Sequence, residues 1–239
     1  MRIEVIGRGN VGSQFARIFG VTPIPPRTLE GLSRDADLYI IAVSDAAVAE
    51  VAGKMPPVNG IVVHTTGSVP MEVLRSVACK GRGVFYPFQT ISSRRQLEAR
   101  RIPLLIEADN GKTLDFLKKV AEEFGFGKIE EADSGRRRKI HLSAVFACNF
   151  TNALIGIGCK ILSEAGIEPD IISPLVEETF EKLKAMPAKE AQTGPAVRKD
   201  YPTMEKHLEL LRQLNMEDEA EIYTDISDYI INSTFASES

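Results

Sequence analysis

The chain has 239 residues, of which 44% are apolar and 26% charged, and its formal net charge is −4. This length allows one or two domains with an ordinary core, without stabilisation by metals or disulfides. The negative charge argues against nucleic acid or an anionic membrane as the main partner. Three cysteines at no framework spacing, with no CxxC or histidine-rich ligand set, predict a reduced cytoplasmic protein that holds no metal. The opening residues MRIEVIG are typical of a strand and not of a signal peptide.

Residues 1 to about 128 alternate short β-rich runs with helical patterns. The runs RIEVIG, ADLYIIAVS, GIVVHTTGS, GVFYPF and IPLLIEA predict strands. Amphipathic helical patterns follow the first three of these runs, and the pattern KTLDFLKKVAEEFG follows the last. This β-α-β order predicts an α/β fold with a mostly parallel sheet and helices on both of its faces.

After about residue 129 only helical patterns follow. From Ser134 to Ala165 the pattern is apolar on nearly every side, which predicts a helix that is buried on every side. Its residues 142–162 are numerous enough to span a bilayer, but Asn149, Asn152 and Lys160 favour a buried core helix. Three further helices are expected beyond residue 172. Since about 110 residues offer this apolar helix few partners, we expect the C-terminal helices to form a homodimer.

The segment GRGNVG at residues 7–12 matches the pattern G-x-G-x-x-G between a strand and a helix. Gly7 allows the tight turn, Gly9 lets the backbone approach a pyrophosphate, and Gly12 lets helix and strand pack closely. The phosphates would bind the helix N-terminus. In this context the motif predicts a bound dinucleotide.

The segment VTPIPPRT follows, where an NAD site usually carries an acid on its second strand. It contains no acid, and its three prolines make the strand itself a weak prediction. Arg27 stands near its end and Arg8 lies inside the glycine loop. A guanidinium suits a 2′-phosphate, so NADP(H) is favoured over NAD(H). Each arginine could instead be a solvated surface residue.

Six segments together resemble one family: IGRGNVG, AVSD, HTTGS, FYPFQT, IHLSAVFACNFTNAL and QTGPAVRKD. It is a family of uncharacterised bacterial proteins with a Rossmann-like N-terminal half and a helical C-terminal half of unknown function. The family is similar to pyrroline-5-carboxylate reductases, deazaflavin-linked NADP oxidoreductases and β-hydroxyacid dehydrogenases. The resemblance covers nearly the whole chain. It implies an NADP-binding domain at residues 1–128, an all-α substrate and dimerisation domain at 129–239, and a substrate cleft between them.

The resemblance also implies which residues contact the cofactor. Those at the dinucleotide phosphates are Gly7, Arg8, Gly9, Asn10, Val11 and Gly12, and the one at the 2′-phosphate is Arg27. Beside the cofactor follow Val43, Ser44 and Asp45, and near the nicotinamide lie Thr65, Thr66, Gly67 and, toward the substrate, Ser68. These positions agree with the rule that ligands bind outside the carboxyl ends of parallel strands.

Hydride transfer requires a proton donor or acceptor from the protein. His141 is the best candidate, because imidazoles titrate near neutrality; Asn149 and Asn152 are amides on an otherwise apolar helix. The histidine could instead be a core or cap residue, and the amides could join helices. β-Hydroxyacid dehydrogenases place Lys and Asn four residues apart on this helix, whereas Val145 stands four after His141. In an α-helix His141 and Asn149 are about 12 Å and about 80° apart, too far to hold one carbonyl oxygen together.

Other polar residues could line the substrate cleft. In the long loop QTGPAVRKD, Arg198 could bind a carboxylate or phosphate while Gln192 and Thr193 orient it, or the loop could be a solvated connector. Tyr86 and Gln89 stand at a strand end. The RRRK run at 136–139 is most simply a solvated helix start.

These patterns favour an NADP(H)-dependent oxidoreductase that transfers hydride to a carbonyl or imine of a small anionic substrate. A non-catalytic NADP(H)-binding or sensing module remains the alternative, because the Lys–Asn pair is missing. A purely structural dimer is disfavoured by the glycine loop and Arg27.

Overall fold

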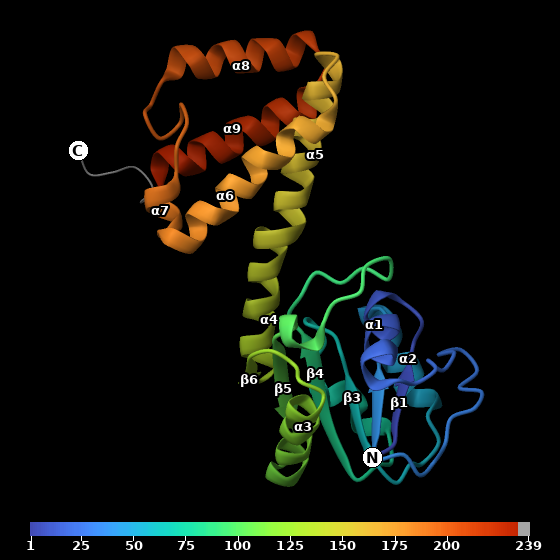
Figure 1. Cartoon of the computed structure of the whole chain (residues 1–239). Coiled ribbons are helices and arrows are strands. Elements are labelled where there is room, and N and C mark those ends of the chain that lie inside the picture. Colours follow the sequence, from blue (N-terminus) through green and yellow to red (C-terminus); the bar gives the residue numbers. More distant parts are fainter. Residues whose placement is uncertain (234–239) are drawn as a thin grey trace. The chain divides into compact units, whose positions relative to one another are not determined.

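The computed structural model describes residues 1–233 (Figure 1). By its contacts the chain divides into two compact units, Met1–Asn149 and Phe150–Ser239. Residue 128, the predicted domain boundary, lies in the first unit directly before its last strand. That boundary stays a prediction, and each unit is treated by itself below.

The first unit contains a six-stranded sheet in the order β1-β2-β3-β4-β5-β6. Its strands are β1 (Ile3–Ile6), β2 (Leu38–Ile41), β3 (Ile61–His64), β4 (Gly81–Pro87), β5 (Leu104–Ala108) and β6 (Ile129–Glu131). All neighbours are parallel except β4 and β5, which are antiparallel. The predicted mostly parallel sheet is confirmed. The three-residue β6 was not predicted, because IEE carries a single apolar residue.

The proline-rich segment after the glycine loop forms a single parallel bridge, Ile24 to Ile6, instead of a strand. The amide of Ile24 donates to the Val5 carbonyl at 2.8 Å, and that of Gly7 donates to the Ile24 carbonyl at 3.0 Å. Prolines on both sides of Ile24 have no amide to extend the ladder. β1 therefore has Ile24 on one side and β2 on the other, which makes its carboxyl end a point where the strand order reverses.

Helices cover both faces of this sheet. They are α1 (Asn10–Phe19), η1 (Asp45–Ala47), α2 (Val48–Lys54), η2 (Met71–Ser76), η3 (Ala99–Arg101) and α3 (Gly111–Glu123). Successive β2 residues point to opposite faces. Leu38 and Ile40 share one core with α1 and α3, while Tyr39 and Ile41 share the other with α2 and η2. The layered α/β architecture is thus encoded by fully apolar strands such as LYII.

The rest of the described chain is helical. It contains α4 (Ser134–Ala144), the π-turn η4 (Val145–Phe150), α5 (Thr151–Glu164), η5 (Pro169–Ile172), α6 (Ser173–Ala185), α7 (Ala188–Ala191), α8 (Tyr201–Gln213) and α9 (Glu217–Asn232). The predicted all-α second half is confirmed from Ser134 onward, whereas β6 lies within the range 129–239 that was expected to be helical. The predicted continuous α-helix from residue 134 is interrupted by η4, which its sequence did not indicate.

The apolar helix is not buried within the chain, which corrects the prediction. Leu142 is 56% exposed and Leu154 is 41% exposed. Among the described residues, the stretch Ser134–Glu164 is the one helix long and apolar enough to cross a membrane, by length and composition only. That criterion is weak evidence, since core and interface helices of soluble proteins also meet it.

Candidate functional site

The glycine loop joins β1 to α1 with a geometry that only glycine allows. Gly7 has φ +127°, and a Cβ there would lie 2.0 Å from the Ala42 carbonyl oxygen. A Cβ on Gly12 would lie 2.2 Å from the Gly7 carbonyl oxygen. At Gly9, by contrast, an added Cβ would meet nothing within 4 Å, so space is open above the loop. The lack of a side chain at Gly7 and Gly12 thus lets the helix and the strand pack closely, while Gly9 leaves room for a ligand.

The N-terminus of α1 has the features of an anion site. Its cap, Gly9, offers no side chain to accept hydrogen bonds from the first amides of the helix. Those amides and the positive end of the helix dipole therefore remain available to a phosphate. The Asn10 side chain lies aside and accepts from the Ser93 amide at 3.0 Å.

A cavity of about 530 Å³ opens over this loop. The predicted cofactor residues that line it are Gly7, Arg8, Gly9, Asn10, Val11, Arg27, Val43 and Ser44. Other lining residues, which sequence reasoning missed, are Pro26, Ala42, Ala47, Glu50 and Val51. The volume is within the range of small-ligand sites, and two of its lining residues are cationic. These features fit a dinucleotide, with its pyrophosphate on the loop and a further phosphate near Arg27.

Glu50 is the unexpected charge in this cavity. It comes from α2, and it pairs with Lys54 one helical turn later at 2.5 Å. The hydrogen bond from Lys54, with further attraction to Arg27, lowers the pKa of Glu50 and keeps it ionised. The segment Val21–Thr28 itself contains no acid. The acid that reaches the cavity comes from a segment more than twenty residues away in sequence.

Asp45, Thr65, Thr66 and Ser68, which were predicted near the cofactor, make contacts within the protein. The Ser68 hydroxyl donates to the Asp45 carboxylate. Thr65 and Thr66 are buried, and the Thr66 hydroxyl is 3.1 Å from Nδ1 of His64. Neither cavity is lined by their side chains, so contact between this segment and a cofactor stays a prediction.

A second cavity of about 390 Å³ gathers the predicted chemical residues of the first unit. Its predicted members are Tyr86, Gln89, His141 and Asn149, and its other lining residues are Phe88, Thr90, Arg101, Pro103, Ala144, Val145, Ala147 and Cys148. Arg101 is the one ionic side chain that lines this cavity besides the titratable Tyr86, His141 and Cys148. It comes from η3, and its role was not predicted because nothing in its run EARR distinguishes it from a surface arginine.

Tyr86 and His141 contact each other directly. The Tyr86 hydroxyl is 3.0 Å from Nδ1 of His141, and the two rings meet edge to face. Burial raises the pKa of Tyr86 to about 12, so its hydroxyl keeps its proton near neutrality. Gly67 makes this arrangement possible, because a Cβ there would lie 2.5 Å from the His141 ring.

The π-turn η4 changes the phase of the helix between His141 and Asn149. In an uninterrupted α-helix these two side chains would be about 80° apart. A π-turn takes one additional residue per turn, which removes about 100° of rotation and leaves them about 20° apart. The smaller angle agrees with the place of both predicted residues, His141 and Asn149, in the lining of one cavity.

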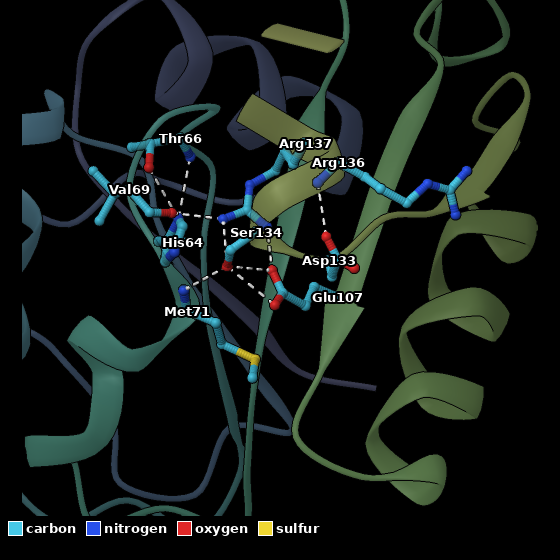
Figure 2. A network of polar contacts seen from close by, with 9 residues as sticks. All are labelled: His64, Thr66, Val69, Met71, Glu107, Asp133, Ser134, Arg136 and Arg137. Atoms are coloured by element: carbon cyan, nitrogen blue, oxygen red, sulfur yellow. Dashed lines mark hydrogen bonds and ion pairs between the residues drawn. The ribbon is translucent and has the colours of Figure 1, made fainter. Parts of the chain in front are cut away.

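A buried polar network anchors the beginning of α4 to the sheet (Figure 2). Arg137, fully buried, forms an ion pair with Glu107 of β5 and donates to the Val69 carbonyl at 2.6 Å. The Ser134 hydroxyl also donates to Glu107, at 3.0 Å. The RRRK run was predicted to be solvated. That prediction is wrong for its second residue, Arg137, which is buried against the sheet.

His64 lies beside this network in the same view (Figure 2). Its Nδ1 accepts from the Thr66 amide at 3.2 Å. Burial, with repulsion from Arg137, lowers the pKa of His64 to about 4, so the ring is neutral. The network connects Val69 and Met71, which follow Gly67, to the helix that carries His141.

The remaining predicted residues belong to the second unit: Asn152, Gln192, Thr193 and Arg198. Asn152 and Arg198 are exposed, and the Gln192 amide donates to the Thr193 carbonyl at 3.0 Å. Thr193 also borders an apolar cavity of about 380 Å³ within that unit, together with Leu154 and Tyr223. Their part in substrate binding stays a prediction.

Comparison with known proteins gives a consistent result. The model of a family described as a domain of unknown function, DUF2520, matches residues 102–230. A candidate NADP oxidoreductase from Bacteroides fragilis is similar along 97% of this chain and 98% of its own, with 31% identity and a TM-score of 0.86. No curated protein matches.

Two more distant structures share the fold alone. An imine reductase from Myxococcus stipitatus, solved in complex with NADP⁺, is 13% identical over 99% of this chain and 96% of its own, with a TM-score of 0.60. A pyrroline-5-carboxylate reductase from Streptococcus pyogenes is 13% identical over 95% and 98%, with a TM-score of 0.58. The predicted resemblance to Rossmann-like reductases is confirmed. Because the family match covers more than half of its residues, the chain belongs to the DUF2520 family.

Proposed function

We propose that the protein is an NADP(H)-dependent oxidoreductase that transfers hydride to a carbonyl or imine of a small anionic substrate. The observation that carries this proposal is that one unit contains both a glycine-loop cavity with two arginines and a cavity where Tyr86 meets His141. The family relatives include a candidate NADP oxidoreductase, and the same fold occurs in an imine reductase solved with NADP⁺.

The residues of the first cavity would hold the cofactor. The open amides at the start of α1 would bind the pyrophosphate, and Arg27 would bind the 2′-phosphate with a charge-assisted hydrogen bond. When bound, NADPH supplies the hydride. Val43 and Ser44, which follow β2, would border the cofactor at the carboxyl ends of the strands.

The residues of the second cavity would bind the substrate and move the proton. His141 would give its proton to the carbonyl oxygen or imine nitrogen as that atom gains charge. The Tyr86 hydroxyl would hold one ring nitrogen of His141, and thereby its orientation. Asn149 would orient the reacting group, and the positive charge of Arg101 supports an anionic substrate. From the second unit, Arg198 remains a further candidate for the anion.

The function also includes a homodimer formed by the C-terminal helices. In the single chain, α5 and α6 contain no buried residue. Large apolar side chains on α6 are instead open to solvent, with Leu175 66% exposed and Phe180 43% exposed. Soluble monomers rarely expose apolar patches of this kind, and a second copy of the same surface would cover them.

Nucleotide binding tests the first half of the proposal. Calorimetric titration of the purified chain with NADP⁺, NADPH and NAD⁺ should show binding, and preference for the phosphorylated forms. Absence of binding by all three would overturn the proposal.

Turnover tests the second half. NADPH oxidation should occur with some member of a panel of small keto acids and cyclic imines, and His141→Gln should lower its rate by about a hundredfold. NADPH affinity should not change, and His207→Gln on the exposed surface of α8 is the matched control. Binding without turnover across the panel would instead favour the sensing module.

A further inference from the structure

Glu50 is the one carboxylate that lines the glycine-loop cavity, and the proposed hydride transfer gives it no role. Its neighbours in the lining fall into two kinds. Pro26, Ala47 and Val51 present apolar surface, and Arg27 presents a cation. Apolar surface beside one acceptor and one donor can accommodate a heterocycle with polar edges.

A carboxylate can only accept hydrogen bonds, so Glu50, which is 63% exposed and already accepts from Lys54, can contact the ligand favourably only at a donor. Glu50 cannot face the 2′-phosphate, because the two anions would repel each other. Arg27 is the residue proposed to attract that phosphate. The 2′ oxygen of NADP(H) also carries no hydrogen, since it is esterified. Two donors remain at the adenosine end, the ribose 3′-hydroxyl and the exocyclic amino group of the adenine. The apolar residues that line the cavity with Glu50 suit the base.

The ion pair with Lys54 makes this role compatible with a phosphorylated ligand. Lys54 lies 2.5 Å from Glu50, so the three side chains Arg27, Glu50 and Lys54 together carry one net positive charge. Glu50 therefore remains ionised and oriented without making the cavity repulsive to phosphate. The two residues of the pair lie one turn apart on α2.

We propose that Glu50 recognises the adenine base by accepting a hydrogen bond from its exocyclic amino group, with Pro26, Ala47 and Val51 against the faces of the ring. The inference rests on the proposed binding of NADP(H) and adds base selectivity to it. Glu50 is a binding residue at the cofactor end of the site, remote from the proton chemistry of His141.

The probe is the deamino analogue of NADP⁺, nicotinamide hypoxanthine dinucleotide phosphate, in which a carbonyl oxygen replaces the amino group. Calorimetry on the wild-type chain should show NADP⁺ binding about fivefold more tightly than the analogue, because two acceptors then face each other. In Glu50→Gln the difference should close to within about twofold, since the amide can donate to the carbonyl. Glu72→Gln, an exposed residue of η2, should leave the difference unchanged.

Three results would overturn the inference while leaving NADP(H) binding intact. The first is equal affinity of the wild-type chain for NADP⁺ and the deamino analogue. The second is a difference in affinity that persists in Glu50→Gln. The third is an equal increase in affinity for both nucleotides in Glu50→Gln. The last would show that Glu50 acts on the phosphate instead of the base. Failure of both nucleotides to bind the wild-type chain would overturn the proposed function itself, and the inference with it.

Discussion

The two units of the chain achieve stability in different ways. In the first, strands such as β2 are fully enclosed, and even the guanidinium of Arg137 is removed from water and paired. In the second, the residues described as buried are few, namely Ala196, Met204, Leu211, Met216 and Ser227. The first unit therefore buries its core and its Arg137–Glu107 ion pair within one chain. The second unit leaves large apolar side chains in water, and it is the unit for which we propose a partner surface.

Of the changes considered, breaking the Arg137 network should lower the stability of the chain the most. Arg137→Ala leaves Glu107 as an uncompensated charge, and the free energy of unfolding should fall by about 3–5 kcal/mol. Its neighbour Arg138 is exposed, and Arg138→Ala should change stability by less than about 0.5 kcal/mol. Urea denaturation of the full chain measures both. Equal, small effects would show that the burial of Arg137 contributes nothing to the first unit.

The network also predicts a pH dependence. The folded pKa of His64 is about 4 and its ordinary value is 6.5, so only the unfolded state takes up a proton between these values. This stabilisation is therefore complete above about pH 6.5 and is lost as the pH falls toward 4, by up to about 3 kcal/mol. His64→Asn should lack this part of the slope. Identical unfolding profiles of the wild type and His64→Asn over this range would contradict the assignment.

The proposed dimer is tested by introducing a charge into the exposed apolar surface of the second unit. If a second copy covers α6, Leu175→Glu would bury a carboxylate, and the dimer dissociation constant should rise at least about a hundredfold. Light scattering should then report the 26.3 kDa chain instead of twice that mass. Glu177→Gln, an exposed residue on the other side of the same helix, is the control. A wild-type chain that is already monomeric at micromolar concentration would refute the dimer.

Much of the first unit was predictable from local patterns. The glycine loop at residues 7–12, the mostly parallel sheet and the lack of an acid in VTPIPPRT follow from short stretches of sequence. Even the weakness of the second strand follows from its prolines, and the structure reduces it to one bridge at Ile24. These features depend on backbone geometry, which neighbouring residues determine.

What could not be predicted depends on contacts between distant segments. Glu50 and Arg101 reach the two cavities from a helix and a 3₁₀ turn whose sequences resemble ordinary surface elements. In RRRK, nothing marks Arg137 as the residue that meets Glu107. The sequence did not indicate the π-turn between His141 and Asn149, so the angle calculated for an ideal helix was too large.

The smallest expected effect concerns the cofactor, and it sharpens the contrast between the units. Arg27→Gln should weaken NADP⁺ binding by about tenfold and leave NAD⁺ binding unchanged, because only the charge-assisted contact to the 2′-phosphate is lost. Arg75→Gln, on exposed η2, is the control. Because the cavity is built entirely from the first unit, the Leu175→Glu chain should bind NADP⁺ as the wild type does. Equal losses for NAD⁺ and NADP⁺ in Arg27→Gln would place Arg27 at the base or the pyrophosphate. Loss of NADP⁺ binding in Leu175→Glu would show that the first unit is not complete by itself.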